Sequence, residues 1–313
     1  MVIGIIANPH AGKAGKDIPH LARVKGAEIH LAVTTRLDQI RDALELFVTK
    51  QVEVIGVYGG DGTLQQVLTT YFAVFNVPPP PILLLRGGSM NIVTYNYHSD
   101  GNPVKLVKRL AKHGYQKHSH LLMRVSSEAH WRPSLPVYGS IFSLGAITEL
   151  LKWYYNGESG LVRAIHTSLH GMAAGLGLAQ AGVNISRQRM KIRVDGKGDF
   201  EESFVLNCLT STVGKLIFKM TPFPEPPTPE HFAWLAYAIE PRECVTNLLP
   251  IVFGSPPAND PRYRYGTAAK LEIETTRDFT VDGELFANLD PRGAVITLER
   301  GPTIFFAEPN QAA

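Results

Sequence analysis

Val52–Thr70, with the sequence VEVIGVYGGDGTLQQVLTT, decides how the rest of the chain is interpreted. Residues 52–58 form an apolar, β-branched run that predicts a buried strand, and residues 64–68 carry apolar side chains at helical spacing. The turn between them consists of Gly59, Gly60, Asp61, Gly62 and Thr63. Glycines let the backbone approach an anion closely, and the first amides of a helix point toward it. The stretch therefore predicts a strand, a turn and a helix N-terminus that bind phosphate.

Asp61 complicates this interpretation, because a carboxylate repels phosphate. Its presence is explained if the side chain faces Mg²⁺ or a hydroxyl group and not the phosphate itself. The alternative is a tight hairpin or an ordinary strand-to-helix turn, in which Asp61 only caps the helix.

Composition limits the classes of protein to consider. The 313 residues are enough for two domains, and 44% hydrophobic and 19% charged residues are typical of a globular protein. A net charge of +3 gives no reason to expect nucleic acid as a partner, although it permits contact with an anionic membrane surface. Cys208 and Cys244 lie among apolar residues and predict buried free thiols. With no leader and no membrane span evident, we expect a cytoplasmic protein that touches a membrane transiently as a peripheral protein.

The first part of the chain alternates between apolar runs and helical patterns. Runs at 2–7, 27–33 and 82–85 predict further strands, and 36–50 and 103–113 predict helices. This alternation indicates a Rossmann-like parallel sheet, and ligands bind such sheets where the strands end. The candidate nucleotide-binding residues outside the central turn lie in the loops after these strands: Asn8, Pro9, Gly12, Thr35, Gly88, Ser89 and Asn91. Thr35 fits equally well as an ordinary helix cap.

From about residue 116 the pattern changes to longer strand-like stretches, which indicates a second, mainly antiparallel β domain. Predicted strands include 190–194, 204–209, 232–239, 268–275, 295–298 and 303–307. His166 and His170 are spaced i, i+4 and could bind a metal, but no third ligand is evident and histidines without a metal are the more common case. Asp282 and Gly283 alone would signal only a turn between strands.

These motifs, in the order NPxxG, TT, GGDGT, GSxN and DGE, resemble the diacylglycerol kinase catalytic-domain family, which includes bacterial lipid kinases and sphingosine kinases. The family belongs to a superfamily with NAD kinases, but the pairing of GGDGT with DGE is a lipid-kinase feature. The resemblance implies an α/β nucleotide-binding domain at 1–120, to which a tail at about 300–313 returns. It also implies a β-rich acceptor domain at 121–299 and an active site in the interdomain cleft.

Three features depart from the family pattern, and the first is Arg86, which stands where a proline is usual. Ile92 stands where the family has an aspartate, and the region of Glu230 and His231 lacks the Asp-Gly pair that borders a structural Mg²⁺. We therefore assign no metal ligands from the sequence. No acidic residue directly follows Gly145, where sphingosine kinases meet a lipid amine, and this favours a neutral lipid alcohol such as diacylglycerol.

The resemblance implies an ATP-dependent kinase with Mg²⁺ that phosphorylates a lipid hydroxyl. Asp61 and Asp282 are candidates to hold the ion or its waters, and Glu284 is the candidate general base. A neighbouring carboxylate such as Asp282 would raise the pKa of Glu284. Two alternatives stay open: a catalytically impaired relative that binds nucleotide or lipid, and a kinase for a soluble acceptor such as NAD. We also expect a homodimer.

Overall fold

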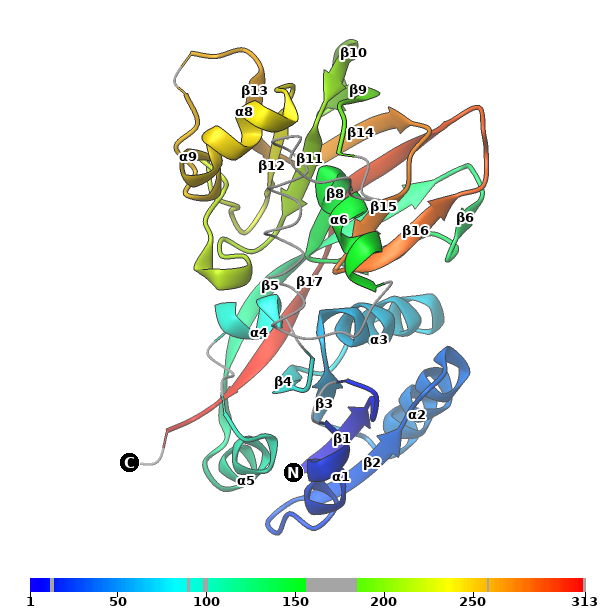
Figure 1. Cartoon of the computed structure of the whole chain (residues 1–313). Helices are drawn as coiled ribbons and strands as arrows, with labels where there is room; N and C mark the ends of the chain where they lie inside the picture. The colour runs from blue at the N-terminus through cyan, green and yellow to red at the C-terminus, as the bar shows by residue number, and fades with distance from the viewer. Residues whose placement is uncertain (12–13, 89–90, 98–100, 156–184, 258, 312–313) are drawn as a thin grey trace. The chain divides into compact units, whose positions relative to one another are not determined.

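A computed structural model describes residues 1–11, 14–88, 91–97, 101–155, 185–257 and 259–311 (Figure 1). The chain forms two compact units. Unit 1 is Met1–His120 with Pro302–Ala313, and unit 2 is Leu121–Gly301. The chain passes from one unit to the other within β5 (Tyr115–Ser127) and again within β17 (Ala294–Pro309).

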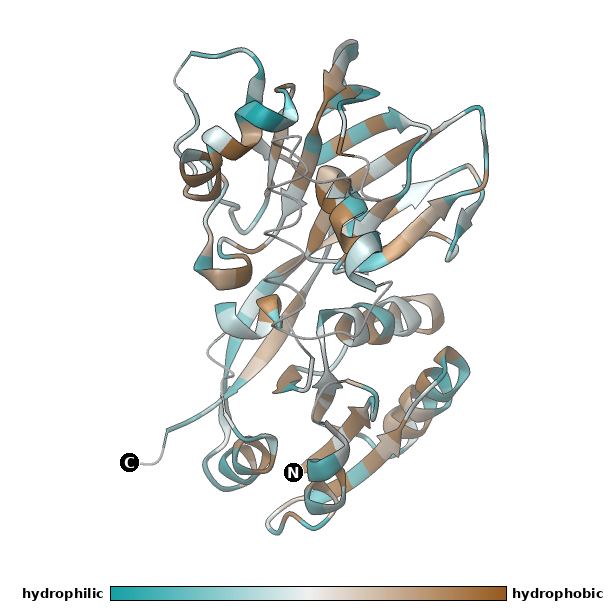
Figure 2. Cartoon of the chain, in the orientation of Figure 1, coloured by the Kyte–Doolittle hydropathy of each residue, from teal (hydrophilic) through white to brown (hydrophobic). Residues whose placement is uncertain are grey.

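Unit 1 is built on a parallel sheet. Its strands are β1 (Val2–Ala7), β2 (Glu28–Val33), β3 (Val54–Gly59) and β4 (Ile82–Arg86), in the order β4-β3-β1-β2. β17 extends this sheet beside β4 in parallel, with Phe306 opposite Ile82. β3 is buried along its whole length, as expected of a strand covered on both faces. Figure 2 shows β1 and β4 as largely hydrophobic.

The helices of unit 1 are α1 (Ala14–Leu21), α2 (Leu37–Thr49), α3 (Asp61–Val74), α4 (Ile92–Asn96) and α5 (Pro103–His113). α2 buries Phe47, whose ring lies against β1 at Gly4. A Cβ added to Gly4 would lie 2.6 Å from the Phe47 ring, so β1 needs a glycine there. α5 begins after Asn102, whose side chain accepts a hydrogen bond from the Lys105 amide at 3.1 Å.

Unit 2 is dominated by antiparallel strands. Its seven-stranded sheet consists of β13 (Tyr263–Ala268), β12 (Phe232–Tyr237), β11 (Asn207–Ser211), β8 (Ile141–Gly145), β15 (Phe279–Val281), β16 (Glu284–Asn288) and β6 (Trp131–Arg132), in that order. The remaining strands are β7 (Val137–Gly139), β9 (Gln188–Val194), β10 (Lys197–Val205) and β14 (Lys270–Thr275). The helices are α6 (Ala146–Tyr155), the 3₁₀ turn η1 (Ile217–Lys219), α8 (Pro241–Thr246) and α9 (Leu248–Val252).

The aromatic core of unit 2 holds β15 in place. The rings of Phe279 and Phe286 are stacked with centroids 5.1 Å apart, and Trp131 meets Phe279 edge-on at 4.8 Å. Such pairs add to the stabilisation from burial alone. This packing fixes the strands that flank residues 282 and 283.

The predicted fold class is confirmed: a mainly parallel α/β region precedes a region of antiparallel strands. Three predicted strand boundaries are wrong. Residues 204–209 contain the end of β10 and the start of β11. Residues 268–275 are two strands, because the Asp195 carboxylate accepts hydrogen bonds from the amides of Ala269 and Lys270, both at 2.9 Å, where the chain changes sheet. Residues 295–298 and 303–307 belong to the single strand β17.

Three other expectations concern single residues or segments. His166 and His170 lie outside the described residues. Both cysteines are free, Cys208 buried and Cys244 partly so. In the part of the chain that the structure describes, no helix is long and apolar enough to span a membrane.

Candidate functional site

The two glycine turns of unit 1 touch each other through their backbones. The amides of Gly87 and Gly88 donate to the Gly59 carbonyl at 2.9 and 3.1 Å. A Cβ added to Gly88 would lie 2.5 Å from the Gly60 Cα, and one added to Gly87 would lie 3.2 Å from the Gly59 Cα. A side chain at Gly88 would force the turns after β3 and β4 apart, so this glycine is needed for their contact.

Asp61 connects the first glycine turn to α4. Its carboxylate accepts hydrogen bonds from the amides of Ile92 at 2.7 Å and Val93 at 3.1 Å, the first two residues of that helix. Burial raises the pKa of Asp61 to about 6, and the two backbone hydrogen bonds act in the opposite direction. The carboxylate therefore stabilises a helix N-terminus. A metal-binding role for Asp61 stays a prediction.

Ile92 takes part in this contact through its backbone, which any residue could supply. The absence of an aspartate side chain at this position therefore does not disturb the bond to Asp61.

Asn91 closes the second glycine turn. It is 1% exposed and has left-handed backbone angles, with φ 49° and ψ 46°. Its Oδ1 accepts from the Gly88 amide at 3.1 Å, and its Nδ2 donates to the Gly88 carbonyl. Asparagine tolerates this conformation better than most residues, which explains its use here. Ser89, in the same turn, lies outside the described residues.

Asn8 joins the end of β1 to the start of α3. Its Nδ2 donates to the Thr63 hydroxyl at 3.2 Å, and its Oδ1 accepts from the His10 amide at 2.9 Å. Pro9 is half-buried in the same turn, while Gly12 lies outside the described residues. Of the residues predicted to bind nucleotide, Asn8 and Thr63 are thus in direct contact.

The first turn of α3 has open backbone amides. Its cap residue is Gly60, which has no side chain to accept from them. Within the described residues, the amides of Asp61, Gly62 and Thr63 have no hydrogen-bond partner. Unpaired amides at a helix N-terminus are a site for an anion such as phosphate.

Thr35 lies apart from this group, at the start of α2. Its amide and hydroxyl both donate to Oε1 of Gln39, at 2.8 and 3.2 Å. The Arg36 amide donates to the same oxygen at 3.2 Å. The N-cap residue of α2 is Arg36, so Thr35 precedes the cap and supports it only through Gln39. Sequence reasoning missed Gln39, although its place three residues after the cap is the usual signal.

Asp282 and Gly283 form a two-residue turn between β15 and β16. Their φ angles are 49° and 85°, both in the left-handed region that such hairpin turns require. The Asp282 carboxylate accepts hydrogen bonds from the amides of Ser140 at 3.0 Å and Ile141 at 2.9 Å. It therefore fixes the corner between β7 and β8.

Glu284 begins β16, directly after this turn, and is half-buried. Burial raises the pKa of Glu284 above its usual value. The neighbouring Asp282, which we expected to raise it, is not the cause. Among the described residues, no hydrogen bond or ion pair engages the Glu284 carboxylate. A desolvated carboxylate without a partner is suited to accept a proton.

A buried group of hydroxyls supports the hairpin, and sequence reasoning did not find it. The Ser143 hydroxyl lies 3.3 Å from those of Thr148 and Thr280, and all three side chains are at most 3% exposed. Small hydroxyl residues in apolar strands give no sequence signal that separates this cluster from ordinary core positions.

The described residues do not assemble a metal site. No group of three or more histidine, cysteine, aspartate or glutamate side chains lies close enough there to hold an ion. Asp61 and Asp282, the two aspartates expected to hold Mg²⁺, each accept backbone hydrogen bonds, and their metal role stays a prediction.

Comparisons with known proteins agree with this architecture. The family described as diacylglycerol kinase catalytic domain matches residues 3–122. A structure from Bacillus anthracis str. Sterne described as "a putative diacylglycerol kinase" superimposes with a TM-score of 0.66 at 16% identity, covering 97% of this chain and 96% of the other. A second diacylglycerol kinase structure from that organism gives 0.62 at 14% identity with the same coverage.

These structural likenesses, at such low identity, show a shared fold. No curated protein matches the chain. The family match covers both glycine turns and the strands that carry them. Residues 3–122 of this chain therefore resemble the diacylglycerol kinase catalytic domain, the family whose model they match.

Proposed function

We propose that this protein is an ATP-dependent kinase that phosphorylates the hydroxyl of a lipid such as diacylglycerol. The observation that carries the proposal is the open first turn of α3, at Asp61, Gly62 and Thr63, within the segment that matches the kinase family. Its unpaired amides fit the phosphates of a nucleotide. Relatives in this family use ATP in general.

The chemistry requires an acceptor for one proton. The lipid oxygen forms a bond to the γ-phosphorus of ATP, the bond from that phosphorus to the bridging oxygen breaks, and ADP leaves. Glu284 takes the hydroxyl proton, because no described residue engages its carboxylate and burial raises its pKa. This role requires unit 2 to present Glu284 to the nucleotide held by unit 1.

The assignment of a neutral acceptor has support in unit 2. After Gly145, α6 carries Glu149, which forms an ion pair with Lys152 at 2.9 Å. Lys152 also pairs with Asp278 at 2.7 Å. Both carboxylates thus already engage the single Lys152 ammonium, and a lipid amine would have to compete with it for them. Contact with a membrane surface, a cytoplasmic location and a homodimer stay predictions.

A labelled-ATP assay tests the proposal, with diacylglycerol, ceramide, sphingosine, phosphatidylglycerol and NAD as acceptors. We expect transfer to diacylglycerol, and a loss of about 10²- to 10⁴-fold in Glu284→Gln, the usual range for removing a general base. Glu128→Gln, at an exposed glutamate of unit 2, is the matched control and keeps full activity. Transfer to NAD with no lipid product would establish the soluble-acceptor alternative.

A second candidate is a protein that binds nucleotide or lipid without turnover. It is favoured by the engagement of Asp61 and Asp282 with backbone amides, which leaves no assembled metal site in the described residues. Calorimetry that shows ATP binding, together with no transfer to any acceptor, would support this candidate over the kinase.

A further inference from the structure

Four cationic side chains line a hollow in unit 1, on elements that the proposed phosphoryl transfer does not use. The hollow has a volume of about 550 Å³. Its lining consists of Arg23, Lys25, Gly26, Lys108 and Lys112. All four cationic residues are exposed, and the lining contains no acidic residue. We call this hollow the basic groove.

One wall of the basic groove is α5, and the other is the turn after α1. Lys108 and Lys112 are spaced i, i+4, so they lie on the same face of the helix. The turn is held against α5 by Val24, which packs in the core that contains Leu106 and Leu110. The cationic side chains of both walls are therefore mounted on a packed framework.

The far end of α5 is also anchored. The Arg109 guanidinium donates to the Pro309 carbonyl at 2.7 Å. The side-chain amide of Asn310 donates to the His113 carbonyl at 2.8 Å, and the backbone amide of Asn310 donates to the Gly114 carbonyl at 3.1 Å. With a capped start and a tethered end, α5 holds the backbone of Lys108 and Lys112 in place, so binding orders only their side chains.

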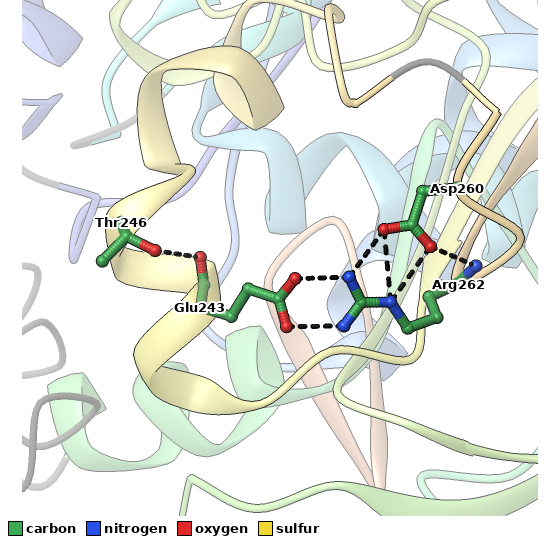
Figure 3. A network of polar contacts seen from close by, with 4 residues as sticks. All are labelled: Glu243, Thr246, Asp260 and Arg262. Carbon is green, nitrogen blue, oxygen red and sulfur yellow. Dashed lines mark hydrogen bonds and ion pairs between the residues drawn. The ribbon is translucent and has the colours of Figure 1, made fainter.

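The four cations of the groove form no ion pair within the described residues and lie close to one another. Arg262, by contrast, donates to both oxygens of Glu243 at 2.6 and 2.7 Å and to Asp260 (Figure 3). Since the net charge of the whole chain is only +3, the groove is a local concentration of positive charge. Binding an anion would relieve its self-repulsion.

We propose that the basic groove binds a phosphate compound with two or more negative charges. The compound is either a soluble polyphosphate or the phosphorylated headgroup of a lipid. Arginine and lysine side chains are the usual phosphate ligands, and the volume of the groove is typical of small-molecule sites. The proposal goes beyond the proposed kinase activity and does not depend on it.

Calorimetric titration of the full chain with tripolyphosphate, and sedimentation with phosphatidylcholine vesicles that contain phosphatidic acid, separate the two sources. We expect Lys108→Glu with Lys112→Glu to weaken binding at least about tenfold. The matched control is Lys50→Glu with Lys197→Glu, at two exposed lysines outside the groove. It makes the same change in net charge. This control keeps the affinity of the wild type.

Hydrogen exchange locates the bound anion and separates the groove from the glycine turns. We expect ligand to protect residues 22–27 and 103–113 in the wild type and in Glu284→Gln, but not in the groove variant. Protection with tripolyphosphate identifies a soluble ligand, and protection with vesicles alone identifies a lipid headgroup. Equal binding by the groove variant and its control, or protection only at the glycine turns, would overturn the proposal.

Discussion

The glycine turns of unit 1 and the Asp282–Gly283 turn of unit 2 share one feature, an aspartate bonded to backbone amides, but they expose different groups. In each, one aspartate accepts hydrogen bonds from two successive backbone amides, from Ile92 and Val93 in unit 1 and from Ser140 and Ile141 in unit 2. The glycine turns leave open the amides of a helix, whereas the hairpin leaves open a carboxylate, that of Glu284.

This difference separates framework from chemistry within the motifs. Asp61 and Asp282 hold neighbouring segments in place, and the groups that can meet a substrate lie next to them. Membership of a motif therefore does not show that a residue touches the reacting atoms. Four variants test this division, beginning with the one that should do the most damage.

Gly88→Ala should be the most disruptive change, because the new Cβ would lie 2.5 Å from the Gly60 Cα. Overpacking of backbone against backbone is expected to cost about 1–3 kcal/mol of stability or more. Urea unfolding measures this cost, and nucleotide binding should weaken with it. Gly214→Ala is the control, since nothing lies within 4 Å of the added Cβ. Equal stability of the two variants would mean that the turns are not in contact.

Asp61 should make stability depend on pH. Its pKa in the folded protein, about 6, is above the usual value for aspartate, so the folded state binds the proton more tightly than the unfolded state. The stability that Asp61 contributes is therefore greatest at acid pH and falls as pH rises from about 4 to 6, by at most about 3 kcal/mol.

The measurement is the difference in unfolding free energy between wild type and Asp61→Asn at several pH values. Groups common to both proteins cancel in this difference. We expect the wild type to lose unfolding free energy relative to Asp61→Asn as pH rises. A difference that stays constant from pH 4 to 7 would show that the carboxylate of Asp61 is not desolvated.

Asp282→Asn should reduce stability by about 1–3 kcal/mol, because the new amide group would face the donors Ser140 and Ile141. Asp195→Asn is an unusually close control. Asp195 also has a left-handed φ, precedes a glycine and accepts from two successive amides. Both variants should lose similar stability, but only Asp282→Asn should lower kcat, since it shifts Glu284. Equal kcat in both would remove Asp282 from the site.

The sequence predicts the fold of unit 1 more completely than that of unit 2. The parallel region follows from apolar runs and helical spacing, which are local properties, so β1 and β3 are found within two residues. The helix α3 is found in its predicted place but begins three residues earlier, inside the predicted turn. The change of sheet at Ala269 depends on Asp195, more than 70 residues earlier in the chain. Local patterns carry no trace of such a contact.

The same limit applies to the candidate site. The glycine turns and the DGE segment are visible as motifs, but the partner of each aspartate is not, because Asp61 bonds residues 31 and 32 positions away and Asp282 bonds residues 141 and 142 positions away. The expected cause of the raised pKa at Glu284 was wrong for a related reason. Burial is a property of the folded chain, whereas adjacency of two carboxylates can be seen in the sequence.

The smallest expected effect concerns the bond between Asn8 and Thr63, which joins the first loop of unit 1 to the glycine turn. Asn8→Ala also removes the bond from the His10 amide, so the single variant alone cannot isolate it. A double-mutant cycle with Thr63→Val does, and we expect a coupling of about 0.5–1 kcal/mol. Unfolding in urea supplies the four free energies. Strict additivity would mean that the loop after β1 is held by its own turn alone. A measurable coupling would instead show that the Asn8 loop and the glycine turn stabilise each other. Together with the contact at Gly88, they would then form one framework that positions the open amides of α3.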